Sequence, residues 1–502
     1  MLFLLHVLAC DPGKVTVGDL DTDRPGKEDP VVVTPTLVMA GPAAIDPLYG
    51  LPATFALVQT HGDVVTVDVR DASGVVVRTL ADGASWADTV VWDGRDDTGV
   101  VLTPGRYTVH ADLAADGTSV AMVEAPIDVV RVGVASGTLG GEDRILLMWH
   151  AAGGLGMYWD DAGDGGTFAV AAIDVDGAVT PIPAPWEDLY APPEDPMGQN
   201  LPAAYTWDAR PTLSLVVAGD VGGAALTPVI DGWTLSTGIV APGETVVFTA
   251  DAPLLTGPGV YEASLALRWM AGADVVGTQD IPLRIYGLFG PPAFEESVTP
   301  YAPWVAVIDP ALRAIAGSFE AGVPPTEAAV ISALVEHIYY DLGLSYDTRW
   351  GASAYTQYEG GSFDDAHIDL SGFLDRRRGS IVNCTDCAAI LEAFANMIGA
   401  TLSYTIITPS FNLNYIKAIG GDSFDHCPFD NGGCGFSYHA VTTPDDGGII
   451  YDATLALDGD EDPGSYPGEE LLVQAITGEE YLDRLVMSGR TNYRYTQKET
   501  LQ

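Results

Sequence analysis

The most informative segment in the C-terminal part of the chain is CTDCAAILEAFANMIG, residues 384–399. Small and apolar residues recur in it at helical spacing, and Gly399 ends the pattern. Cys384 stands at the start of this predicted helix, where unpaired N–H groups and the helix dipole favour a thiolate. The same N–H groups can hold an oxyanion. The stretch therefore predicts a nucleophilic cysteine.

A nucleophilic cysteine needs a base, and the base needs a partner that orients it. His439 is followed thirteen residues later by Asp452, and the turn at 444–447 lies between them. A hairpin closed at that turn would make the two residues directly opposed partners on one face. The chain order Cys, His, Asp then predicts a triad of the papain type.

Three separated motifs resemble the transglutaminase-like superfamily. Residues 384–391, with Gly399 closing the helix, resemble its nucleophile helix, and 439–441 and 451–454 resemble its histidine and aspartate strands. The resemblance spans about residues 300 to 460. It implies Cys384 as nucleophile, His439 as general base and acid, and Asp452 as the orienting residue.

The resemblance also raises the question of an oxyanion donor, because animal members use a tryptophan upstream of the cysteine. Trp350 is the candidate here, and Gln357 is a rival donor. Packing in the core is an equal alternative for Trp350. Val441 stands where many members of the family carry a tryptophan, so the wall of the substrate site differs.

The segments around these motifs favour an α+β domain over residues 295–490. A helix is predicted from Glu327, with apolar residues four apart, and strands are predicted at 402–407, 436–442 and 448–453. Helices followed by antiparallel strands are typical of α+β catalytic domains.

Residues 41–290 consist of short β-like runs broken by Gly, Pro and Asp-Gly turns, which favour stacked sandwiches. The motifs WDGRDDTG at 92–99 and PGRYTV at 104–109 resemble the Ig-like module of flagellar-hook-capping proteins. The resemblance covers about 48–130 and implies a spacer or interaction module. The fold is thus expected to be multidomain: an Ig-like sandwich at 41–130, one or two further β modules at 131–290, and the α+β transglutaminase-like (papain-like) domain.

The first ten residues, MLFLLHVLAC, form an apolar run that ends at Cys10. The run resembles a bacterial lipoprotein signal, in which this cysteine becomes lipidated; an ordinary cleaved signal is the alternative. It is too short to span a bilayer as a helix. With a polar tether at 11–40, the resemblance implies export and a lipid anchor on Cys10, at the outer membrane, the cell surface or in the periplasm.

Of the remaining cysteines, Cys427 and Cys434 are predicted to form a disulfide in an exported protein, and Cys387 to lie in the core. The alternative is a zinc site that combines these three residues with Cys384 and His426, although the second knuckle of a zinc ribbon is missing. Acidic loops at 159–165 and 458–462 offer carboxylates for calcium, but such loops are more often solvated turns. No cofactor is expected.

The charge balance excludes a polyanionic partner. The 502 residues include 22 Lys and Arg against 69 Asp and Glu, a net charge of −47, which argues against nucleic acid. Only four residues are lysine, so the chain is a poor amine acceptor for its own chemistry. The predicted function is a cysteine hydrolase or acyltransferase acting on amide bonds of a protein or peptide substrate. The alternative is a non-catalytic surface adhesin or assembly protein with a degenerate domain that only binds.

Overall fold

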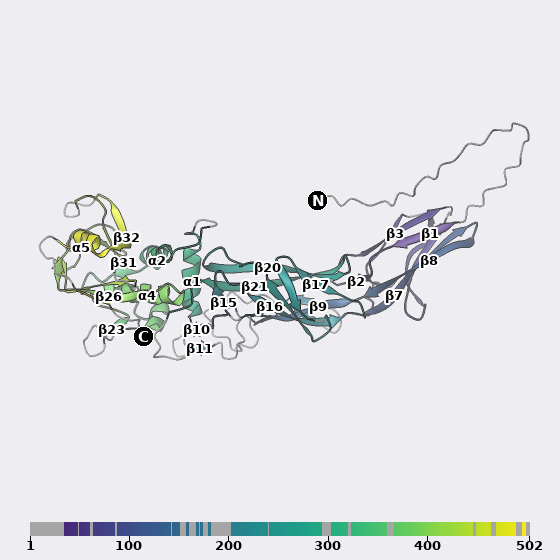
Figure 1. Ribbon diagram of the computed structural model, residues 1–502, viewed down its shortest axis with the longest axis horizontal. Helices are drawn as coiled ribbons and strands as arrows, with labels where there is room; N and C mark the ends of the chain where they lie inside the picture. The colour runs from purple at the N-terminus through teal and green to yellow at the C-terminus, as the bar shows by residue number, and fades with distance from the viewer. Residues whose placement is uncertain are drawn as a thin grey trace, which may run out of the picture.

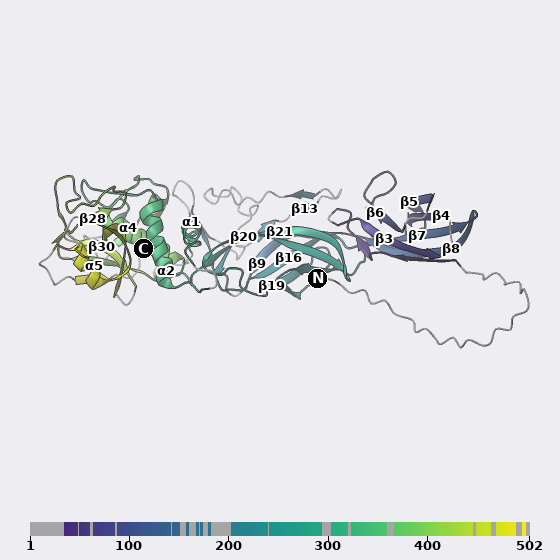
Figure 2. The same ribbon diagram turned by 90° about the horizontal axis from the view of Figure 1, so that it is seen from above.

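The computed structural model places three parts in a row along an elongated molecule, and both views show this order (Figures 1 and 2). A β-sandwich lies at one end, a long twisted sheet lies in the middle, and the helices gather at the other end. The structure describes residues 35–48, 50–60, 64–85, 88–141, 143–150, 157–159, 167–169, 171–173, 179–181, 202–238, 240–293, 303–319, 323–358, 366–444, 448–462, 468–487 and 494–497.

The N-terminal sandwich packs two sheets over one apolar core. One sheet contains β1 (Thr36–Ala40), β3 (Ala53–Thr60) and β6 (Thr89–Trp92); the other contains β2 (Ala44–Ile45), β4 (Val64–Arg70), β5 (Val76–Ser85), β7 (Gly105–Ala115) and β8 (Thr118–Val129). In the core, Trp92 meets Tyr107 edge to face at 6.1 Å. β1 lies within the stretch expected to be a tether, so the sandwich begins before residue 41.

The middle part is one continuous nine-stranded sheet rather than two separate modules, as far as its described strands show. Its strands are β9 (Arg131–Gly140), β12 (Thr167–Ala169), β15 (Ala203–Thr206), β16 (Thr212–Asp220), β17 (Thr227–Ile230), β18 (Trp233–Thr237), β19 (Thr245–Ala250), β20 (Gly259–Ala271) and β21 (Asp274–Leu288). Two small pairs accompany it, β10 (Met148–His150) with β11 (Met157–Trp159) and β13 (Ala171–Ile173) with β14 (Val179–Pro181).

The C-terminal part surrounds one buried helix with a sheet and further helices. The helices are α1 (Val305–Ile315), α2 (Glu327–Glu336), its π-helical continuation η2 (His337–Asp341), α3 (Leu370–Leu374), α4 (Cys384–Met397) and α5 (Gly478–Leu485). The strands are β22 (Ser345–Tyr346), β23 (Thr356–Tyr358), β24 (Ala366–Ile368), β25 (Ile381–Val382), β26 (Ser403–Thr408), β27 (Phe411–Asn412), β28 (Ile416–Ala418), β29 (Gly435–Phe436), β30 (His439–Thr443), β31 (Ile449–Asp458), β32 (Glu470–Thr477) and β33 (Arg494–Gln497).

Helix α4 ends where the sequence predicts. Gly399 has a φ of +83°, a left-handed conformation that glycine adopts without strain. Its backbone lies directly against that of Gly290, where a side chain on either residue would collide. The N–H groups of Phe289 and Gly290 donate to the Ile398 carbonyl at 2.8 and 3.2 Å. The segment leaving β21 is therefore attached to the C-terminal end of α4.

A shared core continues this attachment. Leu147, Ala204, Tyr286 and Leu288 of the middle part belong to the same buried cluster as α1, α2 and α4. The Tyr286 hydroxyl donates to Asp309 on α1 at 3.0 Å. The middle sheet and the helical part consequently form one folded unit.

We predict that Gly399→Ala lowers the free energy of unfolding by at least about 2 kcal/mol, because the added methyl group meets the Gly290 carbonyl in a left-handed conformation. Gly317→Ala is the matched control, since nothing lies within 4 Å of its added Cβ. Urea unfolding of both variants measures the difference, and equal midpoints would contradict the prediction.

Candidate active site

Cys384 is the first residue of α4, and a capping box between Asn383 and Asp386 caps the N-terminus of this helix. The Asn383 side chain accepts from the Asp386 N–H at 3.1 Å, and Asp386 accepts from the Asn383 N–H at 3.3 Å. Cys384 itself is only 4% exposed. The nucleophile predicted from the sequence thus lies at a capped helix N-terminus, just below the surface.

Asp386 also fixes the segment that lies over this helix end. Its buried carboxylate accepts the N–H groups of three successive residues, Ala354 at 2.7 Å, Tyr355 at 2.9 Å and Thr356 at 2.7 Å. Hydrogen bonds from backbone N–H groups to a charged carboxylate are stronger than hydrogen bonds between two neutral groups. Sequence reasoning missed this role, because the three donors lie about thirty residues before the acceptor.

His439 and Asp452 form a fully buried pair, with 2.8 Å between His439 Nε2 and Asp452 Oδ2. The predicted register is nevertheless wrong by two residues. Thr442 stands opposite Tyr451, so regular pairing puts Asp452 opposite Val441 instead of His439. Residues two apart share a face of a strand, which leaves His439 and Asp452 as diagonal neighbours within reach of a long side chain.

The surroundings of His439 favour its charged form. Burial opposes protonation, but the charge and hydrogen bond of Asp452, together with Cys384, outweigh it and raise the pKa of His439 to about 10. Because Nε2 bonds Asp452, the other ring nitrogen, Nδ1, is the one left for Cys384. Among the described residues Nδ1 has no hydrogen-bond partner of regular geometry. The structure therefore brings Cys384, His439 and Asp452 together in that order.

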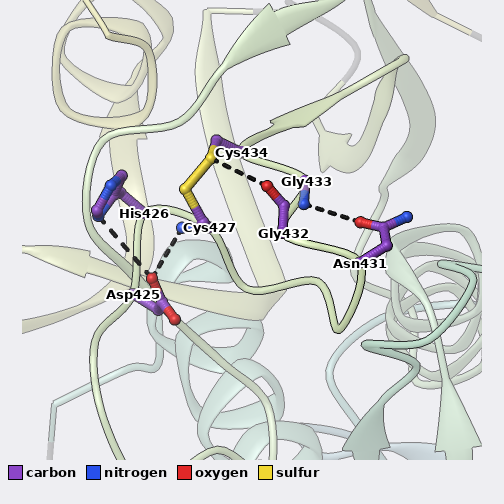
Figure 3. The surroundings of a disulfide bond; sticks show 7 residues. All are labelled: Asp425, His426, Cys427, Asn431, Gly432, Gly433 and Cys434. Atoms are coloured by element: carbon purple, nitrogen blue, oxygen red, sulfur yellow. Dashed lines mark hydrogen bonds and ion pairs between the residues drawn. A yellow bond between two sulfur atoms is a disulfide. The ribbon is translucent and has the colours of Figure 1, made fainter.

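A chain of aromatic rings supports the imidazole. The Phe436 ring stacks on His439 with centroids 4.9 Å apart and planes at 6°, and Phe429 packs against Phe436 at 5.9 Å. Phe429 belongs to the loop that the Cys427–Cys434 disulfide closes (Figure 3). The disulfide loop therefore contacts the site through two phenylalanines.

Hydroxyl groups gather beside Cys384. The Thr385 hydroxyl lies 3.2 Å from both Tyr358 and Tyr438, and the Tyr358 and Tyr404 hydroxyls are 2.7 Å apart. Cys384 packs with Tyr404 and with the half-buried Tyr438. Burial raises the pKa of the three tyrosines, so they remain proton donors at neutral pH. No spacing in the sequence pointed to this group.

The two oxyanion candidates lie at the surface. The Trp350 side chain is 73% exposed, with the Arg349 guanidinium 5.2 Å from its ring centroid, so it is not packed in the core. Gln357 is exposed on β23, opposite His367. Tyr438, which precedes His439, packs against the cluster that contains Cys384, and no motif in the sequence indicated this.

The sites considered for metals contain other interactions. Cys387 is fully buried in the main core, and Cys427 and Cys434 are bonded to each other. Within 458–462 the Asp458 and Asp460 side chains accept local N–H groups. Among the described residues no group of three His, Cys, Asp or Glu could hold a metal ion.

Several predictions fall on residues that the structure does not describe. These are the lipidation of Cys10, the tether up to residue 34, the turn at 445–447 and most of the acidic loop at 159–165. In the described segments, no helix combines the length and apolar character that crossing a membrane requires.

The fold and its sequence relatives define a mostly β protein with an Ig-like domain near its N-terminus. Residues 52–117 match the family model described as the FlgD Ig-like domain. The basal-body rod modification proteins FlgD of Salmonella typhimurium and Salmonella typhi are each 32% identical over 114 residues, which is 22% of this chain and 48% of each relative. The chain thus spans about half the length of the curated relatives it matches.

Among solved structures, the N-terminal eight Ig domains of Down syndrome cell adhesion molecule are similar at 14% identity, with 51% of this chain and 27% of that chain covered. The TM-score is 0.14.

We predict that Asp386→Asn lowers the free energy of unfolding by about 3 kcal/mol, because an amide satisfies fewer of the backbone donors that the buried carboxylate holds. The matched control is Asp347→Asn. The Asp347 carboxylate accepts three N–H groups in a solvent-exposed turn, so its substitution should lower the free energy of unfolding by less than about 1 kcal/mol. Chemical denaturation compares them, and equal losses would rule out the special role of Asp386.

A second prediction concerns pH. The folded pKa of His439, about 10, lies above its ordinary value of 6.5, so its contribution to stability is full below pH 6.5 and is lost as pH rises through 10. The wild-type chain should have a higher free energy of unfolding than His439→Gln, and this difference should decrease between pH 6.5 and 10 by at most ~1.4 kcal/mol per pH unit. Unfolding free energies from pH 6 to 10 test this, and parallel curves for the two proteins would refute it.

Proposed function

We propose that the part of the chain from α1 onward is a transglutaminase-like α+β domain that cleaves or transfers amide bonds of proteins or peptides. The observation that carries the proposal is the buried His439–Asp452 pair beside a cysteine at a capped helix N-terminus. If the His439–Asp452 pair served only stability, no thiol would be required beside it. If the Cys384 thiol served only packing, no charged imidazole would be required beside it.

In the proposed reaction, the Cys384 thiolate attacks the amide carbonyl carbon while His439 carries the proton on Nδ1. The tetrahedral intermediate collapses as the C–N bond breaks, and Nδ1–H protonates the leaving amine. Neutral His439 then removes a proton from water, or from another amine, which attacks the thioester and releases Cys384. Asp452 keeps the imidazole oriented through Nε2 in both halves.

In the proposed reaction, the N-terminal end of α4 holds the oxyanion. The Asp386 N–H is used in the capping box, and the Cys387 N–H donates to the Asn383 carbonyl. In the first turn of the helix, the N–H groups of Cys384 and Thr385 are then the ones that can donate to an oxyanion. The Tyr438 hydroxyl is a third donor on the same side. These three donors take the role of oxyanion donor that the sequence suggested for Trp350 or Gln357.

We further propose that the protein is exported and tethered through Cys10, with the Ig-like domain as a spacer or interaction module. The Cys427–Cys434 disulfide supports an oxidising compartment, the periplasm or the cell surface. The Ig-like domain supports a place outside the cytoplasm, since its relatives are named as basal-body rod modification proteins. Water or an amine on another molecule is the favoured acceptor, because only four residues of this chain are lysine and self-crosslinking is disfavoured.

One observation favours a second candidate, a domain that only binds. His439 and Asp452 are 0% and 1% exposed, and Cys384 is little more accessible. A domain of this fold that had lost turnover could keep the pair for stability and present its surface to a partner.

We predict that iodoacetamide at pH 7 alkylates Cys384 at least about tenfold faster in the wild-type protein than in His439→Ala, because His439 stabilises the thiolate. Mass spectrometry of the labelled peptide distinguishes Cys384 from Cys387, which is buried in the core and should remain unlabelled.

Cys384→Ala is the control for site assignment, and it should also abolish cleavage in a screen of peptide substrates. Slow labelling at equal rates in wild type and His439→Ala would reject the enzyme and favour the binding domain.

A further inference from the structure

Asp452 receives more donors than a triad partner needs. Its Oδ2 accepts both the His439 ring, at 2.8 Å, and the Tyr481 hydroxyl, at 2.7 Å. Its Oδ1 accepts the Thr454 N–H at 2.7 Å. The carboxylate is thus held from three sides, and one of the three donors comes from a separate helix.

That helix is α5, which follows β32 and stands outside the motifs that identified the triad. The Thr477 side chain caps α5 by accepting the Glu480 N–H at 3.2 Å. Tyr481 therefore lies in the first turn of this helix. The Tyr481 side chain is fully buried. Its ring lies 6.4 Å from the His439 ring, with planes at 16°.

A hydroxyl that shares Oδ2 with the imidazole has two physical effects. It restricts rotation of the carboxylate, which keeps Oδ2 aimed at His439 Nε2. It also stabilises negative charge on that oxygen, so the carboxylate pulls less strongly on the Nε2 proton. A base that must give up and take back a proton in each cycle benefits from that moderation.

We infer that Tyr481 is a positioning residue for the proposed reaction, which holds Asp452 and moderates its hold on the imidazole. This inference rests on the proposed function. Tyr481 need not touch the substrate, because its hydroxyl is engaged by Asp452.

The other ionisable groups near the pair must be separated from His439 in any titration. They are Cys384 and Cys387 on α4, Tyr346 on β22, Tyr339 on η2, Tyr404 on β26 and Tyr438 beside His439. Burial raises the pKa of the Cys387 thiol and of these four tyrosines. An alkaline step in Cys384 reactivity is therefore assigned to His439 where it is lost in His439→Gln.

The test is the pH dependence of Cys384 alkylation by iodoacetamide in the full chain with Tyr481→Phe. A carboxylate with one donor fewer binds the imidazolium more tightly, so the alkaline step should move upward by about half a pH unit or more. Tyr286→Phe is the matched control: it removes another buried hydrogen bond from a tyrosine to an aspartate, away from the triad, and should leave the step in place.

A double variant guards against a general effect on folding. In an Asp452→Asn background the step itself should fall, because the charge of Asp452 is lost, and adding Tyr481→Phe should move it by less than about 0.2 units. If the wild-type protein is reactive but Tyr481→Phe leaves the step unmoved or lowers it, the inference fails. If wild-type Cys384 is unreactive, the proposed function fails first.

Discussion

The arrangement of the candidate site depends on the buried carboxylate of Asp386. It ties three successive N–H groups of residues 354–356 to the first turn of α4, and it completes the cap that starts the helix at Cys384. A carboxylate buried without donors would be costly, so the segment and the helix end must form together. The position of the thiol follows from that requirement.

A second constraint acts through rings and hydroxyls. The disulfide loop supports Phe436 through Phe429, Phe436 stacks on His439, and Tyr481 holds Asp452. Each contact comes from a different segment of the chain, although all converge on one imidazole. Burial within this enclosure opposes protonation of His439, but the charge and hydrogen bond of Asp452, together with Cys384, outweigh it and raise the pKa.

What the sequence could predict was local. The helix that begins at Cys384 was readable because its apolar spacing and the glycine that ends it, Gly399, lie in one stretch, and the triad types followed from three short motifs. The register of His439 and Asp452 was wrong by two residues, since a turn centre does not fix a hairpin. Tyr481, Phe436 and the donors to Asp386 could not be found, because tertiary packing brings them together. The exposure of Trp350 was equally invisible.

The attachment between Gly290 and Gly399 has a mechanical meaning. The two backbones touch where the middle sheet ends and α4 ends, and residues 289 and 290 are bonded to the last turn of that helix. Tension applied to the Ig-like end of the molecule would run along β21 and arrive at α4, the helix that carries Cys384 at its opposite end. The three parts in a row would therefore transmit force from the Ig-like end to the helix that holds Cys384.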